Sequence, residues 1–219
     1  MRSIYEAELS QLGEDLATMA RQVQSAIERA TEALLTNNAE LAQAVIADDA
    51  KLDELETRVD ERCVLLIAQQ QPVGLDLRTI IVSLRISAGL ERMGDLSQHI
   101  AEAARRAYPE SAIPTTHREI FEGMSTAAKD AAAQVITLIE TRDLNVAAQI
   151  ASDDDLLDNL HSEAYQRLLA KDYKGTAQET LDTALLARFF ERFGDHAVGT
   201  SRRIVYLVTG DLNNSAAAI

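Results

Sequence analysis

The chain has 219 residues and a formal net charge of −14, and 47% of its residues are hydrophobic. This composition supports a packed core and excludes intrinsic disorder, while the acidic balance excludes general binding of nucleic acid or of an anionic membrane. A single cysteine, Cys63, excludes an internal disulfide and fits a reducing compartment. With no secretory signal and no apolar stretch of membrane-spanning length, we expect a cytoplasmic protein without direct membrane insertion.

The first part of the chain carries a heptad pattern that predicts a long helix. Its apolar residues step by three and four positions, which matches the period of a helix and not that of a strand. The positions are Leu9, Leu12, Leu16, Met19, Val23, Ala26, Ala30 and Ala33. We expect this helix to end near Asn37, which with Glu40 forms a capping pair for a second helix.

Prolines and glycines mark where the next two helices end. Pro72 and Gly74 stop the second helix at about Gln71. A third helix is expected from about Asp76 to Ala107, where two further prolines follow.

Two capping boxes are predicted in the second half of the chain. Thr116 with Glu119 opens a fourth helix, Thr176 with Glu179 opens a sixth, and a fifth lies between them. Gly210 suits the residue that ends the sixth helix. Because no segment alternates with the period of a strand, we predict an all-α fold of six long helices.

Two sequence blocks recur in the same order in the two halves. Leu-Glu-Arg-Met-Gly-Asp at 90–95 returns as Phe-Glu-Arg-Phe-Gly-Asp at 190–195. The second helix likewise matches the fifth, through Ile-Ala-Asp-Asp at 46–49 and Ile-Ala-Ser-Asp-Asp at 150–154. We therefore expect two tandem three-helix bundles, over residues 1–110 and 111–219.

Carboxylates replace apolar residues late in the third helix. Positions spaced alternately four and three residues apart along this helix are apolar from Leu77 to Ala88. The next two positions in the series are acidic, Glu91 and Asp95. Residues four apart share a helix face, so the two carboxylates lie about one turn apart. Burying both without a partner would be expensive, and a cation is one way to offset that cost.

Four carboxylate pairs of this spacing are the candidate metal ligands. They are Glu91 with Asp95, Glu191 with Asp195, Asp49 with Asp53, and Asp154 with Asp158. Oxygen-rich clusters suit magnesium, calcium, manganese or iron, and His161 adds a nitrogen donor near Asp158. The alternative is that these groups are solvated or held in salt bridges. Arg92 follows Glu91 directly and is expected to point away from this face.

Both Glu-Arg-x-Gly-Asp motifs place a glycine inside a helix. Glycine costs about 1 kcal/mol there relative to alanine, so Gly94 and Gly194 indicate close approach by another backbone. The isolated histidines and the single cysteine are not interpreted as site residues. We expect His99 and His117 on the surface and Cys63 in the core.

No arrangement of residues predicts catalysis. The chain has no GxSxG motif, no phosphate-binding loop and no Glu-x-x-His pair of the di-iron bundles. We therefore expect a protein that is not an enzyme. A carboxylate-bridged metal enzyme and a purely structural scaffold remain the alternatives.

The Gln-Pro-Val-Gly-Leu-Asp-Leu-Arg segment at 71–78 and the doubled Glu-Arg-x-Gly-Asp motif resemble the PhoU family of phosphate-signalling regulators. The resemblance covers the whole chain. It implies a cytoplasmic regulator that links the ATPase subunit of the high-affinity phosphate ABC transporter to a sensor histidine kinase. It further implies repression of the phosphate-starvation response when phosphate is plentiful, a homodimer, and divalent or iron ions at the carboxylate pairs.

Overall fold

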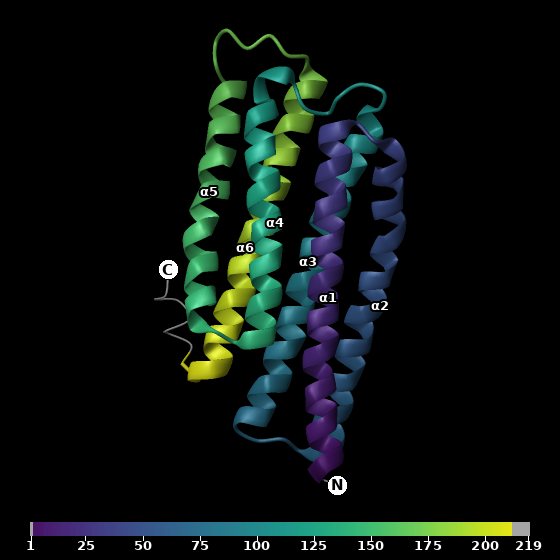
Figure 1. The fold of residues 1–219 in the computed structure, drawn as a ribbon, viewed down its shortest axis with the longest axis vertical. Helices are drawn as coiled ribbons and strands as arrows, with labels where there is room; N and C mark the ends of the chain where they lie inside the picture. Colours follow the sequence, from purple (N-terminus) through teal and green to yellow (C-terminus); the bar gives the residue numbers. More distant parts are fainter. Residues whose placement is uncertain (1, 212–219) are drawn as a thin grey trace.

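The computed structural model describes residues 2–211, and its regular structure within that range is entirely helical (Figure 1). The elements are α1 (Arg2–Thr36), α2 (Ala39–Gln70), α3 (Leu75–Ala107), the 3₁₀ turn η1 (Thr115–His117), α4 (Arg118–Thr141), α5 (Leu144–Leu168) and α6 (Ala177–Thr209). The prediction of an all-α fold with six long helices is confirmed. None of these helices has an apolar stretch long enough to cross a membrane.

The two repeats lie side by side, with α2 and α5 at opposite edges of the molecule (Figure 1). Helices α1 to α3 pack together, and so do α4 to α6. Across the boundary α3 packs on α6 and α1 packs on α4. The buried side chains of both repeats form one continuous core. A division into separate domains at residues 110 and 111 therefore stays a prediction.

The core follows the heptad pattern of α1 closely. Six of its predicted positions are buried, namely Leu12, Leu16, Met19, Val23, Ala30 and Ala33. Leu9 and Ala26 are only partly buried, at the rim of the core. Cys63 is fully buried, as predicted, and burial raises the pKa of its thiol to about 12. This cysteine is therefore a packing residue and not a reactive thiol.

The cap predictions succeed for α6. The Thr176 side chain accepts a hydrogen bond from the Glu179 backbone N–H at 3.1 Å, and the Glu179 carboxylate accepts one from the Thr176 N–H at 2.7 Å. Gly210 ends the helix with φ of 77°, a left-handed conformation that suits glycine.

The cap prediction for α2 is off by one residue. Asn38, not Asn37, accepts the hydrogen bond from the Leu41 N–H, at 3.0 Å. Asn37 instead has φ of 54° and turns the chain between α1 and α2. Asparagine suits both positions, because it caps helices and tolerates the left-handed region.

The capping box predicted for α4 is wrong. Thr116 lies inside η1, and α4 begins only after His117, without a side-chain cap. The Thr116 Oγ1 atom instead lies 3.0 Å from His117 Nδ1. The 3₁₀ turn also buries His117 completely, against the edge of the Tyr173 ring, so the expectation of a surface histidine is wrong as well.

Candidate functional site: two acidic clusters between paired helices

Each repeat brings two helices together at its motif glycine. A β-carbon on Gly94 of α3 would overlap Leu52 Cδ2 of α2. A β-carbon on Gly194 of α6 would overlap Asp154 Oδ1 of α5 and lie 2.8 Å from Leu157 Cδ1. The glycines therefore do permit a close approach, although side chains of the neighbouring helix, rather than its backbone, fill the space. Each approach places an acidic segment of one helix beside the acidic motif of the other.

The first acidic cluster consists of Asp49, Asp53 and Glu56 from α2 and Glu91 and Asp95 from α3. Burial, followed by the charges of Asp53 and Asp95, raises the pKa of Asp49 to about 6. Burial and the Asp95 carboxylate raise the pKa of Glu91 to about 7. The pKa of Glu56 is also raised, by burial and by neighbouring carboxylates. These mutual effects show that the four predicted ligands of this repeat share one acidic environment.

Arg92 partly neutralises the first cluster. Its Nη1 atom lies 2.7 Å from Asp95 Oδ2, and its Nε atom lies 3.3 Å from Glu91 Oε2. The expectation that Arg92 points away from this face is therefore wrong, because its long side chain bends back over the helix surface. The Arg92 side chain is 60% exposed, so solvent screens these pairs and limits their contribution to stability.

The second acidic cluster consists of Asp154, Asp158 and His161 from α5 and Glu191 and Asp195 from α6. Burial, with the charges of Asp158 and Asp195, raises the pKa of Asp154 to about 7. Burial and Asp195 also raise the pKa of Glu191, while Arg188 and His161 act in the opposite direction. Arg188 pairs directly with the Glu191 carboxylate.

Three possible metal-ligand atoms of the second cluster are buried without a hydrogen-bond partner among residues 2–211. They are Asp154 Oδ1, His161 Nε2 and Glu191 Oε2. Buried polar atoms normally have partners, and leaving them unpaired is costly. Two carboxylate oxygens and an imidazole nitrogen are suitable ligands for manganese or iron, so this chain's residues fit a bound cation. Within residues 2–211, however, no three such side chains already stand close enough together to hold an ion.

Sequence reasoning did not identify Glu56. The two repeats are related so that Glu56 follows Asp53 with the spacing by which His161 follows Asp158. Because the repeat aligns Glu56 with the predicted ligand His161, the sequence itself carries a signal for Glu56. The clusters thus differ at one equivalent position, which is a carboxylate in the first repeat and an imidazole in the second.

Two of the apolar residues that precede the acidic motifs at heptad spacing lie at an exposed edge of the bundle. Leu77 is 37% exposed and Leu181, on α6, is 55% exposed. The buried side of α3 instead carries Ile80, Ile86 and Leu90. The acidic motifs therefore lie at the boundary between core and solvent, where an ion or a partner has access.

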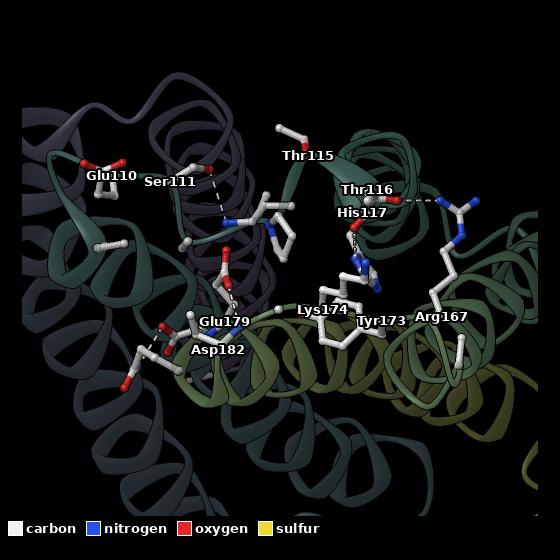
Figure 2. Close-up of a pocket in the computed structure, with 18 of the residues that line it drawn as sticks. Glu110, Ser111, Thr115, Thr116, His117, Arg167, Tyr173, Lys174, Glu179 and Asp182 are labelled. Atoms are coloured by element: carbon white, nitrogen blue, oxygen red, sulfur yellow. Dashed lines mark hydrogen bonds between the residues drawn. The ribbon is translucent and has the colours of Figure 1, made fainter.

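A separate pocket of about 1150 Å³ lies between the segment that joins the repeats and the loop between α5 and α6 (Figure 2). It is lined by both basic and acidic side chains, among them Arg167, Lys174, Glu179 and Asp182. The Arg167 guanidinium bonds the Thr116 carbonyl at 2.7 Å. None of the acidic-cluster residues lines it. We therefore place the candidate site at the clusters and not here.

Comparison with known proteins agrees with this architecture. A family model described as the PhoU domain matches residues 16–104 and again residues 121–204. The PhoU homolog 2 of Mycobacterium tuberculosis, named a phosphate-specific transport system accessory protein, is 38% identical over 96% of this chain and 99% of its own length. A protein named as a PhoU homolog in Rhizobium meliloti is 32% identical over 95% of this chain and 88% of its own.

A solved structure has the same fold. The crystal structure of PhoU from Pseudomonas aeruginosa superposes with a TM-score of 0.88 at 26% identity, covering 94% of this chain and all of that one. The chain therefore belongs to the PhoU family, as its motifs suggested.

Proposed function

We propose that this chain is an accessory regulator of a phosphate transport system, and that it acts by contacting partner proteins and not by catalysis. The observation that carries the proposal is similarity along nearly the whole chain to relatives that are named accessory proteins of such a system. The two acidic clusters, one per repeat, lie at the boundary between core and solvent and support a role in which repeated surfaces are presented to partners. No name among these relatives describes an enzyme, which disfavours the carboxylate-bridged metal enzyme.

The proposed partners are the ATPase subunit of the phosphate ABC transporter and a sensor histidine kinase. Both lie at the cytoplasmic face of a membrane, so we propose a cytoplasmic location and reversible assembly with them. Long bundle helices present the grooves that helical partners occupy. A homodimer would double the number of such surfaces. In this arrangement the chain keeps the phosphate-starvation response repressed while phosphate is plentiful.

We further propose that each acidic cluster binds divalent or iron ions. The support is the crowding of the carboxylates and the unpartnered donors of the second cluster, Asp154 Oδ1, His161 Nε2 and Glu191 Oε2. A bound cation would supply positive charge to these groups and crosslink α5 to α6. In this chain the ligands would come from the carboxylate pairs, assisted by Glu56 in the first repeat and His161 in the second.

The test is a deletion of the gene with a reporter of phosphate-starvation transcription. We expect the reporter to be on in phosphate-rich medium, and to be repressed again by the wild-type gene in trans. Where a paralogue is present, the double deletion is the strain to measure. A strain without either copy that still represses the reporter would refute the regulatory proposal. Reversing both charges of Glu191 and Asp195 should restore repression less than the wild type does.

A further inference from the structure

The internal repeat places two equivalent pockets in the protein, one on each side of the molecule. The first pocket lies between α1, α2 and α3 and includes Asp48, Asp49 and Gly94 in its lining. The second lies between α4, α5 and α6 and includes the equivalent Asp153, Asp154 and Gly194. Their volumes differ greatly, at about 20 Å³ for the first and about 310 Å³ for the second. The first has room for little more than one water molecule, whereas the second is of the size that binds ligands.

An arginine of the chain itself fills the first pocket. Arg29 of α1 lines it, and its Nη1 atom bonds Asp48 Oδ2 at 2.8 Å. The Lys51 ammonium bonds the other oxygen of Asp48 at 2.6 Å. Two cations therefore compensate the carboxylate at this position.

Among residues 2–211, the hydrogen-bond partners of the equivalent carboxylate, Asp153, are neutral. Gln134 of α4 bonds Asp153 Oδ2 at 2.6 Å, with the same separation of 19 residues that joins Arg29 to Asp48. The other oxygen of Asp153 accepts from Gln149, also at 2.6 Å. Glutamine is shorter than arginine and carries no charge, and Ala127 stands in the lining where the first repeat has Gln22, so the second pocket is more open. Within residues 2–211 no cationic side chain pairs with Asp153.

The second pocket presents acidic groups and hydrogen-bond acceptors. Asp130, Asp153 and Asp154 line it, and no lysine or arginine of the described part of the chain does so. Asp154 Oδ1 and the nearby Gln134 Oε1 are both buried without a hydrogen-bond partner. Both atoms accept hydrogen bonds, so a cationic hydrogen-bond donor is one group that would satisfy them. A guanidinium offers five N–H donors and a positive charge, as Arg29 does in the first repeat.

We propose that the second pocket binds a guanidinium group, supplied by an arginine side chain of a partner protein. The first repeat provides the template, since the same fold position there already holds a guanidinium. The residues at the rim of the second pocket favour a protein as the source of the guanidinium. Leu156 stands beside the pocket, 52% exposed, where the first repeat has Lys51. Arginine is common among interface anchors, and an acidic pocket with an apolar rim suits both its guanidinium and its methylene stem.

The inference rests on the proposed role as a partner-binding protein, but its test uses the isolated full-length chain. The uniformly ¹⁵N-labelled protein is titrated with L-argininamide in EDTA, and the backbone amide signals of Ala127, Ala131, Ile150 and Gly194 are followed. L-citrullinamide, which replaces the guanidinium by a neutral urea group of similar shape, is the matched ligand control. We expect saturable shifts with argininamide and at least tenfold weaker binding of citrullinamide.

Two variants exchange the arginine of the first repeat and the glutamine of the second, and a third variant is the control. Gln134→Arg should place a guanidinium in the second pocket and weaken argininamide binding at least tenfold. Thr137→Arg adds the same charge at an exposed position of α4, one turn away, and should leave binding within twofold of wild type. Arg29→Gln should open the first pocket and create a second set of shifts around Gly94.

Several outcomes would overturn the proposal. Equal binding of citrullinamide would show that the guanidinium charge is not recognised. Unchanged binding by Gln134→Arg would place the ligand elsewhere. Shifts of the same signals with MgCl₂ but not with argininamide would identify a site for a small hydrated cation. Free L-arginine carries a carboxylate that the acidic rim repels, so free arginine binding as tightly as argininamide would indicate a small-molecule site. None of these results bears on the deletion phenotype.

Discussion

Asp154 occupies the space that a side chain at position 194 would need, because a β-carbon on Gly194 would overlap its Oδ1 atom. The same β-carbon would press on Leu157 Cδ1. The glycine weakens the intrinsic helix propensity of α6, by about 1 kcal/mol. In return it lets α5 lie close enough for Asp154 to join Glu191 and Asp195. The geometry of the second cluster therefore depends on a missing side chain.

Gly194→Ala should destabilise the protein, by about 1–2 kcal/mol, because overpacking outweighs the gain in helix propensity. Gly199 lies in the same helix, and a β-carbon there would meet nothing within 4 Å. Gly199→Ala should therefore stabilise, by up to about 1 kcal/mol. Urea unfolding of both variants measures the difference. Equal stabilisation by the two substitutions would mean that α5 and α6 are not closely apposed.

The repeat explains which parts of the site the sequence could predict. Glu91 and Asp95 were identifiable because they recur as Glu191 and Asp195. Each of the two motifs also contains a glycine that helix propensity does not explain. Glu56 was missed, since a lone acidic residue on a charged helix carries no signal until the repeats are aligned. The choice between Asn37 and Asn38 as a cap depends on backbone angles that composition does not determine.

Other features required contacts between elements distant in the chain. The burial of His117 results from the 3₁₀ turn that precedes α4, which the sequence pattern did not predict. The ion pairs of Arg92 with Glu91 and Asp95 depend on the conformation of a long side chain. The difference between Arg29 and Gln134 becomes informative only when α1 is aligned with α4. Those two helices share the positions of their apolar residues rather than their identities.

The contribution of Asp154 to the stability of the metal-free protein should fall as pH rises from about 4 to about 7. The folded-state pKa of Asp154 is about 7, above its ordinary value of 3.8, mainly because of burial. Between these values the folded state holds a proton that the unfolded state has released, so raising the pH favours unfolding, by at most about 1.4 kcal/mol per pH unit for this group. Urea unfolding in EDTA at pH 5 and pH 8 measures the slope.

Replacement of Asp154 supplies the control for this slope. Asp154→Asn should reduce the pH dependence and should be more stable than wild type at pH 8, by about 1–2 kcal/mol, since a crowded charge is removed. Asp155→Asn changes an exposed neighbouring carboxylate and should retain most of the wild-type slope, because Asp155 makes the smallest contribution to the raised pKa of Asp154. An unchanged slope in Asp154→Asn would contradict the burial of this carboxylate.

The two acidic clusters should differ in metal preference. His161 supplies an imidazole to the second cluster where Glu56 supplies a carboxylate to the first. Carboxylates suit both magnesium and manganese, but manganese and iron accept an imidazole ligand more readily than magnesium does. We expect Mn²⁺ to raise the melting temperature more than Mg²⁺ does. His161→Glu should reduce this difference, while Glu56→His should increase it. Melting curves unaffected by either ion would argue against metal binding at both clusters.

The contact between Arg106 and Asp182 should contribute to the joining of the two repeats. Arg106, in the last turn of α3, bonds the Asp182 carboxylate at 2.6 Å, and Gln178 bonds its other oxygen at 2.8 Å. The Asp182 side chain is only 7% exposed, so loss of Arg106 leaves a buried charge with a single neutral partner.

Arg106→Ala should therefore cost about 1–2 kcal/mol, less than for a fully buried pair because the Arg106 side chain is itself 54% exposed. Arg105→Ala is the matched control. It removes an adjacent arginine whose hydrogen bond to Gln43 is exposed, and should change stability by less than about 0.5 kcal/mol. Adding Asp182→Asn to Arg106→Ala should recover part of the loss, because the uncompensated charge is then absent. In a double-mutant cycle by urea unfolding, strictly additive effects of the two substitutions would mean that the pair does not couple α3 to α6.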